Sequence, residues 1–176
     1  LLVQIQNKID FTSHNFLIGI NRILWGLFKK IVIADRLAMF VDPIFHDYQS
    51  FDGSHLLLAT YFFSLQIYFD FSGYCDIAIG SAKLFGYNLS ENFNFPYYSK
   101  SIKEFWHRWH ITLSSWFRDY VYLSLGGKSA RKYYWIRNIV LTFIVSGFWH
   151  GASWNFIVWG FIHSILYIMG IFSISK

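Results

Sequence analysis

Cysteine, proline and acidic residues are scarce in this sequence. The single cysteine, Cys75, excludes an internal disulfide and a zinc site built from several thiolates. Only 14% of the 176 residues are charged, whereas a soluble domain carries about 25%. Hydrophobic residues reach 55% and aromatic residues 23%, and Trp and Tyr favour the membrane–water interface. These proportions predict an integral membrane protein in a lipid bilayer.

Acidic residues number 10 against 15 basic ones, which leaves a net charge of +5. In a membrane protein this excess predicts cytoplasmic loops that face anionic lipid, and the basic, acid-free segment 126–137 is expected to be one of them. Nucleic-acid binding is not expected, since it would require a basic face on a soluble fold. Phosphate-binding loops of the GxxxxGK[ST] and GxGxxG types are absent, as are the GxSxG and HExxH motifs.

The first half of the chain opens with a predicted amphipathic helix. The sequence begins at Leu1, with no basic segment and cleavage site before the first apolar run, which indicates a fragment whose natural start is missing. Apolar residues recur at helical spacing over 16–41. Thr12 or Ser13 is expected to cap this helix, and Pro43 is expected to end it.

A second apolar stretch, 54–85, carries two carboxylates, Asp70 and Asp76. As one straight helix it would be about 48 Å long, which exceeds one bilayer, so a kink or break is expected near residues 72–73. Carboxylates in apolar sequence need partners, and structural ion pairs are the favoured interpretation. Asp70 could pair with Arg118 or with a histidine, and it is therefore also a candidate lining residue for a substrate path.

The second half predicts one amphipathic helix and one broken apolar segment. Charged residues within 105–125 make a simple membrane span improbable, so a re-entrant or interfacial helix is expected there. Residues 138–172 would form a helix about 52 Å long, and Gly147 and Gly151 are natural places for it to break. The chain is thus predicted to be an all-α, polytopic membrane bundle with re-entrant or broken helices.

Segment 105–125 carries a pair of tryptophans and a pair of adjacent charges. Trp109 and Trp116 are expected to share one helix face. Arg118 and Asp119 are neighbours, so they are expected to point to different sides and to seek different partners. The guanidinium of Arg118 could hold a phosphate or a pantetheine-type acyl donor; the alternative is an ion pair inside the bundle.

His150 is the leading catalytic candidate. It lies in the run SGFWHG at 146–151, inside otherwise apolar sequence, where an ionisable residue usually marks function. A neutral imidazole there can act as a general base on a hydroxyl. His110 could orient a substrate or shuttle the proton, although each histidine could instead be a core residue bonded to a neighbouring carbonyl or carboxylate.

No metal site is predicted. His107 and His110 have the i, i+3 spacing of a ligand pair, but no nearby carboxylate or cysteine completes a site. The remaining histidines are interpreted as loop, interface or packing residues: His14, His46, His55 and His163. Cys75 is interpreted as a small buried thiol.

Five segments carry a family resemblance: FKKIVIADR at 28–36, YFDFSGYCDIAIG at 68–80, ENFNFP at 91–96, FWHRWHITLSSWFRD at 105–119 and SGFWHG at 146–151. Together they resemble the membrane-bound O-acyltransferase (MBOAT) family, most closely the bacterial branch that serves alginate and peptidoglycan O-acetylation. The resemblance covers nearly the whole chain. It implies that residues 1–176 form one membrane domain fragment of a larger fold, without the helices that precede it in family members.

The resemblance also implies a mechanism. Family members form a multi-pass bundle around a central tunnel in the cell (inner) membrane, and the family's invariant histidine matches His150 and its second histidine His110. Trp149 then joins Trp109, Asp70 and Arg118 as a lining candidate. No bound cofactor is implied. The acyl donor, acetyl-CoA or an acylated carrier, is expected to reach the tunnel from the cytoplasmic side. A periplasmic acetyltransferase partner and a polysaccharide acceptor are expected on the opposite side of the membrane.

The expected activity is transfer of an acyl group, acetyl in the first instance, to hydroxyls of an envelope polysaccharide such as alginate or peptidoglycan. Transfer of D-alanine from a carrier protein to teichoic acid is the alternative within the family. A proton-coupled transporter would use intramembrane His, Asp and Arg equally well, and a non-catalytic scaffold is a further alternative.

Overall fold

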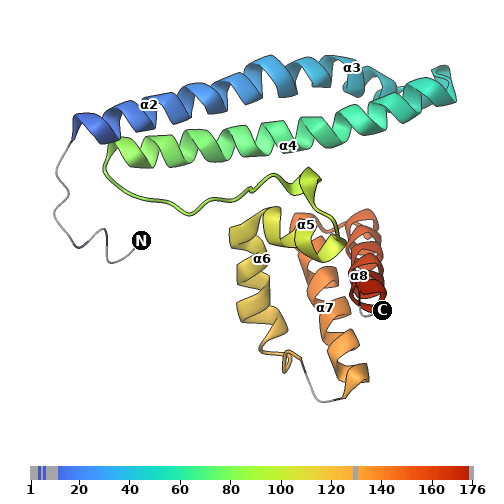
Figure 1. Cartoon of the computed structure of the whole chain (residues 1–176). Helices are drawn as coiled ribbons and strands as arrows, with labels where there is room; N and C mark the ends of the chain where they lie inside the picture. The colour runs from blue at the N-terminus through green and yellow to red at the C-terminus, as the bar shows by residue number, and fades with distance from the viewer. Residues whose placement is uncertain (1–3, 5, 7–11, 129–130, 175–176) are drawn as a thin grey trace. The chain divides into compact units, whose positions relative to one another are not determined.

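The computed structural model describes residues 4, 6, 12–128 and 131–174, and within them the regular secondary structure is entirely helical, as predicted. Two compact units divide the chain, Leu1–Glu91 and Asn92–Lys176. Each unit is a small set of packed helices, labelled in Figure 1.

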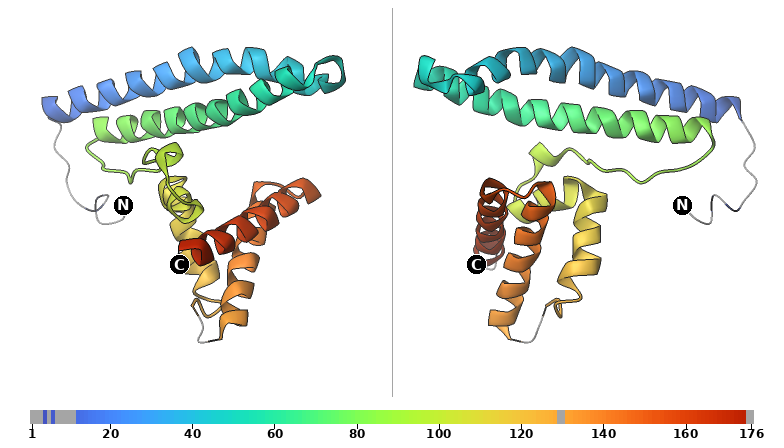
Figure 2. Two further views of the ribbon diagram at one scale, coloured as in Figure 1. Left: turned by 45° about the vertical axis from the view of Figure 1, so that its right-hand side comes forward. Right: turned by 180° about the vertical axis from the view of Figure 1, so that it is seen from behind.

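The first unit is a long helical hairpin. Its first arm joins α2 (Ser13–Leu27), a π-helical segment η1 (Phe28–Ala34) and α3 (Asp35–His46) without interruption. A short 3-10 turn, η2 (Tyr48–Ser50), leads to the second arm, α4 (Gly53–Leu84), which runs beside the first arm in every view (Figure 2). Thr12 is confirmed as the N-cap of α2, because its hydroxyl accepts from the backbone N–H of Asn15 at 3.1 Å.

The predicted helix end at Pro43 is wrong, because α3 continues to His46. A proline inside a helix removes one hydrogen bond, which normally favours ending the helix before it. Here the turn around the proline carries Val41 and Ile44, which are 0% and 3% exposed. Burial of these side chains holds the turn in helical form for three more residues, and the N–H of Asp47 then bonds the carbonyl of Pro43 at 3.2 Å.

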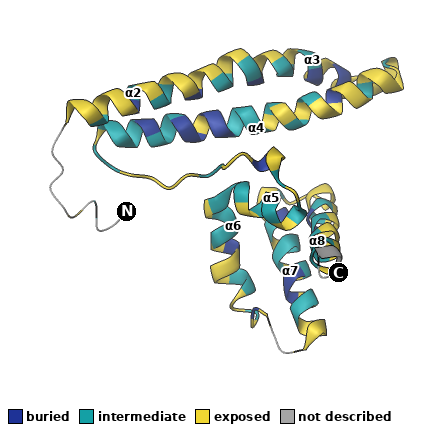
Figure 3. Cartoon of the chain, in the orientation of Figure 1, coloured by how far each residue is buried: buried dark blue, intermediate teal, exposed yellow. Residues whose placement is uncertain are grey.

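The predicted break near residues 72–73 is also wrong, because α4 is one helix of 32 residues. Its glycines serve close helix packing instead. A Cβ atom on Gly73 would lie 2.8 Å from the carbonyl oxygen of Gly26, and one on Gly80 would lie 2.7 Å from that of Gly19. The two backbones approach each other so closely that only glycine fits. Most of the buried positions of α4 lie in this half of the helix, as Figure 3 shows.

A buried carboxylate ties the two arms together beside these glycines. Asp76 is 3% exposed, and its two oxygens accept from Arg22 Nε at 2.6 Å and from Lys29 Nζ at 2.5 Å. Arg22 also bonds Glu91 at 2.6 Å. The structural ion-pair interpretation of Asp76 therefore holds.

Replacing Asp76 by alanine is expected to lower the free energy of unfolding by about 3–5 kcal/mol, because it leaves the largely buried Lys29 without its counter-charge. Thermal unfolding of the purified full-length protein in detergent would measure the loss. The double variant Asp76→Leu/Lys29→Met should recover part of it. An Asp76→Ala variant that melts with the wild type would show that the pair contributes nothing.

The second unit begins with η3 (Pro96–Tyr98) and two short helices, α5 (Ile102–Arg108) and α6 (Ile111–Phe117). The single amphipathic helix predicted over 105–125 is therefore wrong. The helix breaks at Trp109 and His110, where His110 adopts a left-handed conformation with φ 43°. A π-helical turn, η4 (Arg118–Tyr122), follows. The shared face predicted for Trp109 and Trp116 is lost at this break.

Two longer helices complete the second unit, α7 (Lys132–His150) and α8 (Trp154–Ile174). The break predicted between residues 147 and 151 is confirmed, since α7 ends at His150 and α8 begins three residues after Gly151. Gly147 and Gly160 lie where the two helices touch, and added Cβ atoms there would collide with the carbonyl oxygens of Phe156 and Phe143 respectively.

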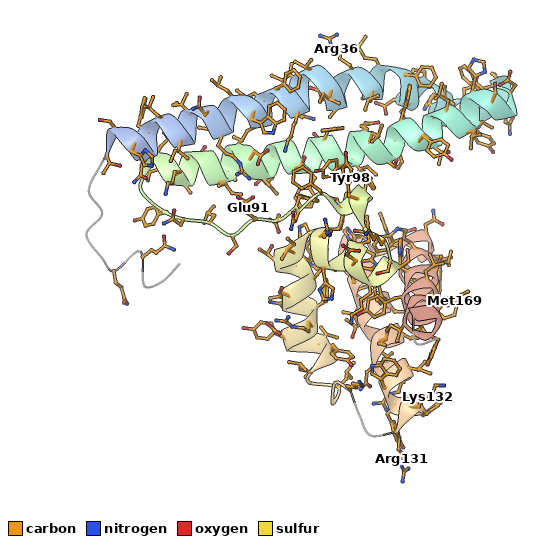
Figure 4. The ribbon with its side chains drawn as sticks, in the orientation of Figure 1. Arg36, Glu91, Tyr98, Arg131, Lys132 and Met169 are labelled. Atoms are coloured by element: carbon orange, nitrogen blue, oxygen red, sulfur yellow. The ribbon has the colours of Figure 1, made fainter. Side chains whose placement is uncertain are left out.

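Among the described residues one helix is long and apolar enough to cross a membrane, the Trp154–Phe172 part of α8. Most of this stretch is not buried within the chain. At its end, the ammonium of Lys132 lies 4.3 Å from the centre of the Phe172 ring. Figure 4 shows Arg131 and Lys132 at the start of α7 and Met169 projecting from α8.

Candidate functional site

His150 is the last residue of α7, at the turn into α8. The turn is held by backbone hydrogen bonds from Ser153 to Gly151 at 2.8 Å and from Phe156 to Ser153 at 3.1 Å. The imidazole is exposed and lies near three aromatic rings. Its ring centre is 5.0 Å from that of Trp149, 5.3 Å from that of Trp159 and 6.2 Å from that of Phe156.

His110 lies at the break between α5 and α6 and is only partly exposed. Its ring centre is 6.5 Å from that of Trp149, which also contacts Phe117 at 6.4 Å. Trp149 therefore contacts both histidines, which come from positions 40 residues apart. Three of the predicted site residues, His110, Trp149 and His150, are brought together by the fold.

A third histidine, which the sequence analysis interpreted as a loop, interface or packing residue, extends this cluster. His163 of α8 packs between Trp159 at 4.5 Å and Trp106 at 5.1 Å, and its Nδ1 atom is buried without a hydrogen-bond partner among the described residues. Trp159 thus contacts both His150 and His163. The available signal was that His163 interrupts the apolar stretch after Gly151, the same signal that singled out His150.

Trp109 lies in an aromatic group around α5. Its ring stacks on Phe105 at 5.6 Å, meets Phe93 edge-on at 5.0 Å and lies 6.3 Å from Tyr97. These contacts fix the end of α5 immediately before the His110 break. They give Trp109 a packing role beside the histidine cluster, and a role in lining a substrate path stays a prediction.

Arg118 pairs with its own neighbour rather than with a distant group. Its Nε and Nη2 atoms donate to the two oxygens of Asp119 at 2.7 Å and 3.2 Å. The prediction that these adjacent charges seek different partners is wrong, because the side chains fold back on the exposed π-helical turn. The guanidinium lowers the pKa of Asp119 below its usual value through this hydrogen bond.

Asp70 belongs to the first unit and pairs with Lys30 at 2.6 Å. Lys30 also contacts Asp35 at 2.9 Å, so one ammonium serves two carboxylates. The pairing with Arg118 or a histidine that the sequence suggested is wrong. Both side chains of the Lys30–Asp70 pair are about half exposed, and an ion pair this exposed contributes about 0–1 kcal/mol to stability.

Within the part of the chain that the structure describes, no group of three or more His, Cys, Asp or Glu side chains is arranged to hold a metal ion. Cys75 is buried, as predicted, at 6% exposure. The titratable side chains gathered at the turn between α7 and α8 are imidazoles. A neutral imidazole can take a proton from a hydroxyl and return it to a leaving group, and the indoles around His150 provide an apolar surface on which to do so.

The sequence of this chain is similar to those of known proteins. Residues 2–174 match the model of the membrane-bound O-acyltransferase family. The chain is 46% identical over 160 residues to a peptidoglycan O-acetyltransferase of Helicobacter pylori, covering 91% of this chain and 30% of the relative. It is 46% identical over 162 residues to a probable alginate O-acetylase of Azotobacter vinelandii, covering 92% and 32%.

A teichoic acid D-alanyltransferase of Bacillus subtilis is 36% identical over 160 residues, covering 84% of this chain and 39% of the relative. The chain thus spans about a third of the length of these relatives. The family match nevertheless extends over almost all of its residues. The chain belongs to the membrane-bound O-acyltransferase family.

Proposed function

We propose that the protein to which this chain belongs is a multi-pass O-acyltransferase of the cell (inner) membrane. It transfers an acetyl group to hydroxyls of an envelope polysaccharide such as alginate or peptidoglycan. The observation that carries the proposal is the joint contact of His110 and His150 with Trp149. The family match and the names of the two relatives at 46% identity support it.

In this proposal the neutral ring of His150 acts as general base. It accepts the proton of the acceptor hydroxyl while the hydroxyl oxygen attacks the acyl carbonyl of the donor. The acyl–sulfur bond of the donor breaks, and the thiolate that leaves takes up the proton. His110 lines the path beside Trp149, and Trp109, Arg118 and Asp70 are the further lining candidates.

The donor, acetyl-CoA or an acylated carrier, would enter from the cytoplasmic side of a central tunnel. The acceptor hydroxyl would belong to the polysaccharide itself or to an extracytoplasmic acetyltransferase partner, which then passes the acetyl group on to the polysaccharide. The basic residues around the start of α7 support this orientation, since basic loops favour the cytoplasmic side: Lys128, Arg131, Lys132 and Arg137.

The test uses membranes that contain the full-length protein, and the same membranes without it. Radiolabelled acetyl donor is supplied with alginate or peptidoglycan, and covalent label in the polysaccharide is counted. Protein-dependent label is expected. A parallel arm supplies D-alanyl carrier protein and teichoic acid, because one relative is a teichoic acid D-alanyltransferase.

The outcomes separate the alternatives. Label only in the D-alanine arm would replace acetyl by D-alanyl transfer. Label that enters sealed vesicles without becoming covalently attached would identify a transporter. Wild-type membranes that neither attach nor move label would contradict the proposal.

A further inference from the structure

The loop before α5 pairs with the helix break that carries His110. The N–H of Asn94 donates to the carbonyl of Arg108 at 3.0 Å, and the N–H of Ile111 donates to the carbonyl of Asn92 at 3.0 Å. These two bonds lie on either side of the break. The loop therefore clamps the backbone immediately before Trp109 and immediately after His110.

The side chain of Asn92 adds a second attachment on the α6 side. Its Oδ1 atom accepts from the backbone N–H of Thr112 at 3.2 Å and from the Thr112 hydroxyl at 2.6 Å. The first N–H groups of a helix have no partner within the helix, and the residue before it usually supplies one. His110 occupies that position in α6 but makes no side-chain cap, so Asn92 supplies the cap from a distant part of the sequence.

This attachment matters because the backbone of His110 is held in an uncommon conformation. Its φ of 43° and ψ of 55° are left-handed, which a residue with a side chain adopts at a cost of about 1–2 kcal/mol. Such a conformation persists only where surrounding contacts hold the backbone in place, and it is common at functional sites. The loop bonds to Arg108, Ile111 and Thr112 are those surroundings.

We propose that Asn92 is a positioning residue for His110: its carbonyl and its side-chain oxygen fix the start of α6, and thereby aim the imidazole of His110 toward Trp149 and the His150 site. The inference rests on the proposed acyl transfer. The proposal gives a role to Asn92 of the ENFNFP segment, which the sequence analysis used only as one of the segments that carry the family resemblance.

The test measures acyl transfer by the full-length protein carrying Asn92→Ala. The kcat is expected to fall about 10–100-fold, since small misplacements of a reacting group have effects of this size. The KM for the acyl donor should change less than about threefold, because Asn92 acts on the orientation of a ring rather than on donor binding. Asn92→Asp keeps an acceptor oxygen for Thr112 and should stay within about threefold of the wild-type kcat.

Two comparisons separate positioning from a general packing role. In a His110→Ala background, Asn92→Ala should lower kcat no further, because the ring that it positions is gone. Asn94→Ala is the matched control, since both contacts of Asn94 run through its backbone, and it should keep the wild-type kcat.

The proposal is overturned if Asn92→Ala retains the wild-type kcat. It is also overturned if Asn92→Ala lowers kcat by the same factor in the His110→Ala background as in the wild type. If Asn92→Ala fails to accumulate in the membrane, Thr112→Val is used instead, because it removes only the hydroxyl that donates to Asn92. Its kcat is expected to fall by less than that of Asn92→Ala, and again no further in the His110→Ala background. A wild-type protein that transfers no label would overturn the proposed function itself, a result visible before any variant is compared.

Discussion

Replacing His150 by alanine in the full-length protein is expected to lower acyl transfer about 10²–10⁴-fold, the usual contribution of a general acid–base group. The side chain lies at the exposed end of α7 against indole and phenyl rings. Its removal therefore takes away the proton acceptor and little of the packing. Label transferred to polysaccharide, normalised to the amount of protein in the membrane, measures the effect.

His107→Ala provides the matched control for this prediction. His107 is an exposed histidine of α5 in the same unit, and its side chain should be dispensable. His150→Gln, which preserves the approximate shape and polarity of the ring, should be as inactive as His150→Ala because its amide cannot accept the proton. Wild-type rates in both His150 variants would remove His150 from the chemistry and turn attention to His110 and His163.

Replacing Gly147 by leucine is expected to destabilise the second unit by at least about 3 kcal/mol, the upper end of what overpacking usually costs. An added Cβ would collide with the carbonyl oxygen of Phe156 and lie 3.4 Å from the Cα of Gly160. These neighbours are backbone atoms, which cannot rotate away, so α7 and α8 would have to separate. Thermal unfolding of the purified protein and acyl transfer should then fall together, because the same contact sets His150 against Trp159.

Gly170→Ala, on the neighbouring helix α8, is the control. A Cβ atom there would meet only Ile102 at 3.9 Å, an ordinary contact, and alanine favours helix by about 1 kcal/mol over glycine. The Gly170→Ala protein should therefore melt at or above the wild-type temperature. If Gly147→Leu also melts with the wild type, the close approach of α7 and α8 is not what holds the unit together.

Glycine shows where sequence reasoning succeeds and where it fails. The pattern around Gly147 and Gly151 correctly predicted a break between two apolar helices. The same reasoning placed a break at Gly73, where the helix runs straight through. A glycine permits a bend and equally permits two backbones to touch, and only the partner helix decides between them. That partner, carrying Gly26, lies 47 positions away in the sequence.

Two of the three clustered histidines, His110 and His150, could be predicted as site candidates from the sequence, but the way the chain brings them together could not. An ionisable residue in apolar sequence identified His150 without any structure. The left-handed turn at His110 was not predictable, because its cause is a hydrogen-bonded loop rather than a glycine or proline at the break. The partner of Asp70 was missed for a similar reason, since Lys30 reaches it only through the packing of the helical hairpin.

The placement of charge along α7 has a consequence for how the substrates meet. Lys132 is the first residue of this helix and His150 the last, so about 27 Å of helix separates the basic end from the imidazole. If the basic end faces the cytoplasm in the proposed acyltransferase, the acyl group has to pass along about 27 Å of α7 before it reaches the imidazole. Substitutions along α7 would then slow delivery of the donor and leave affinity for the polysaccharide unchanged.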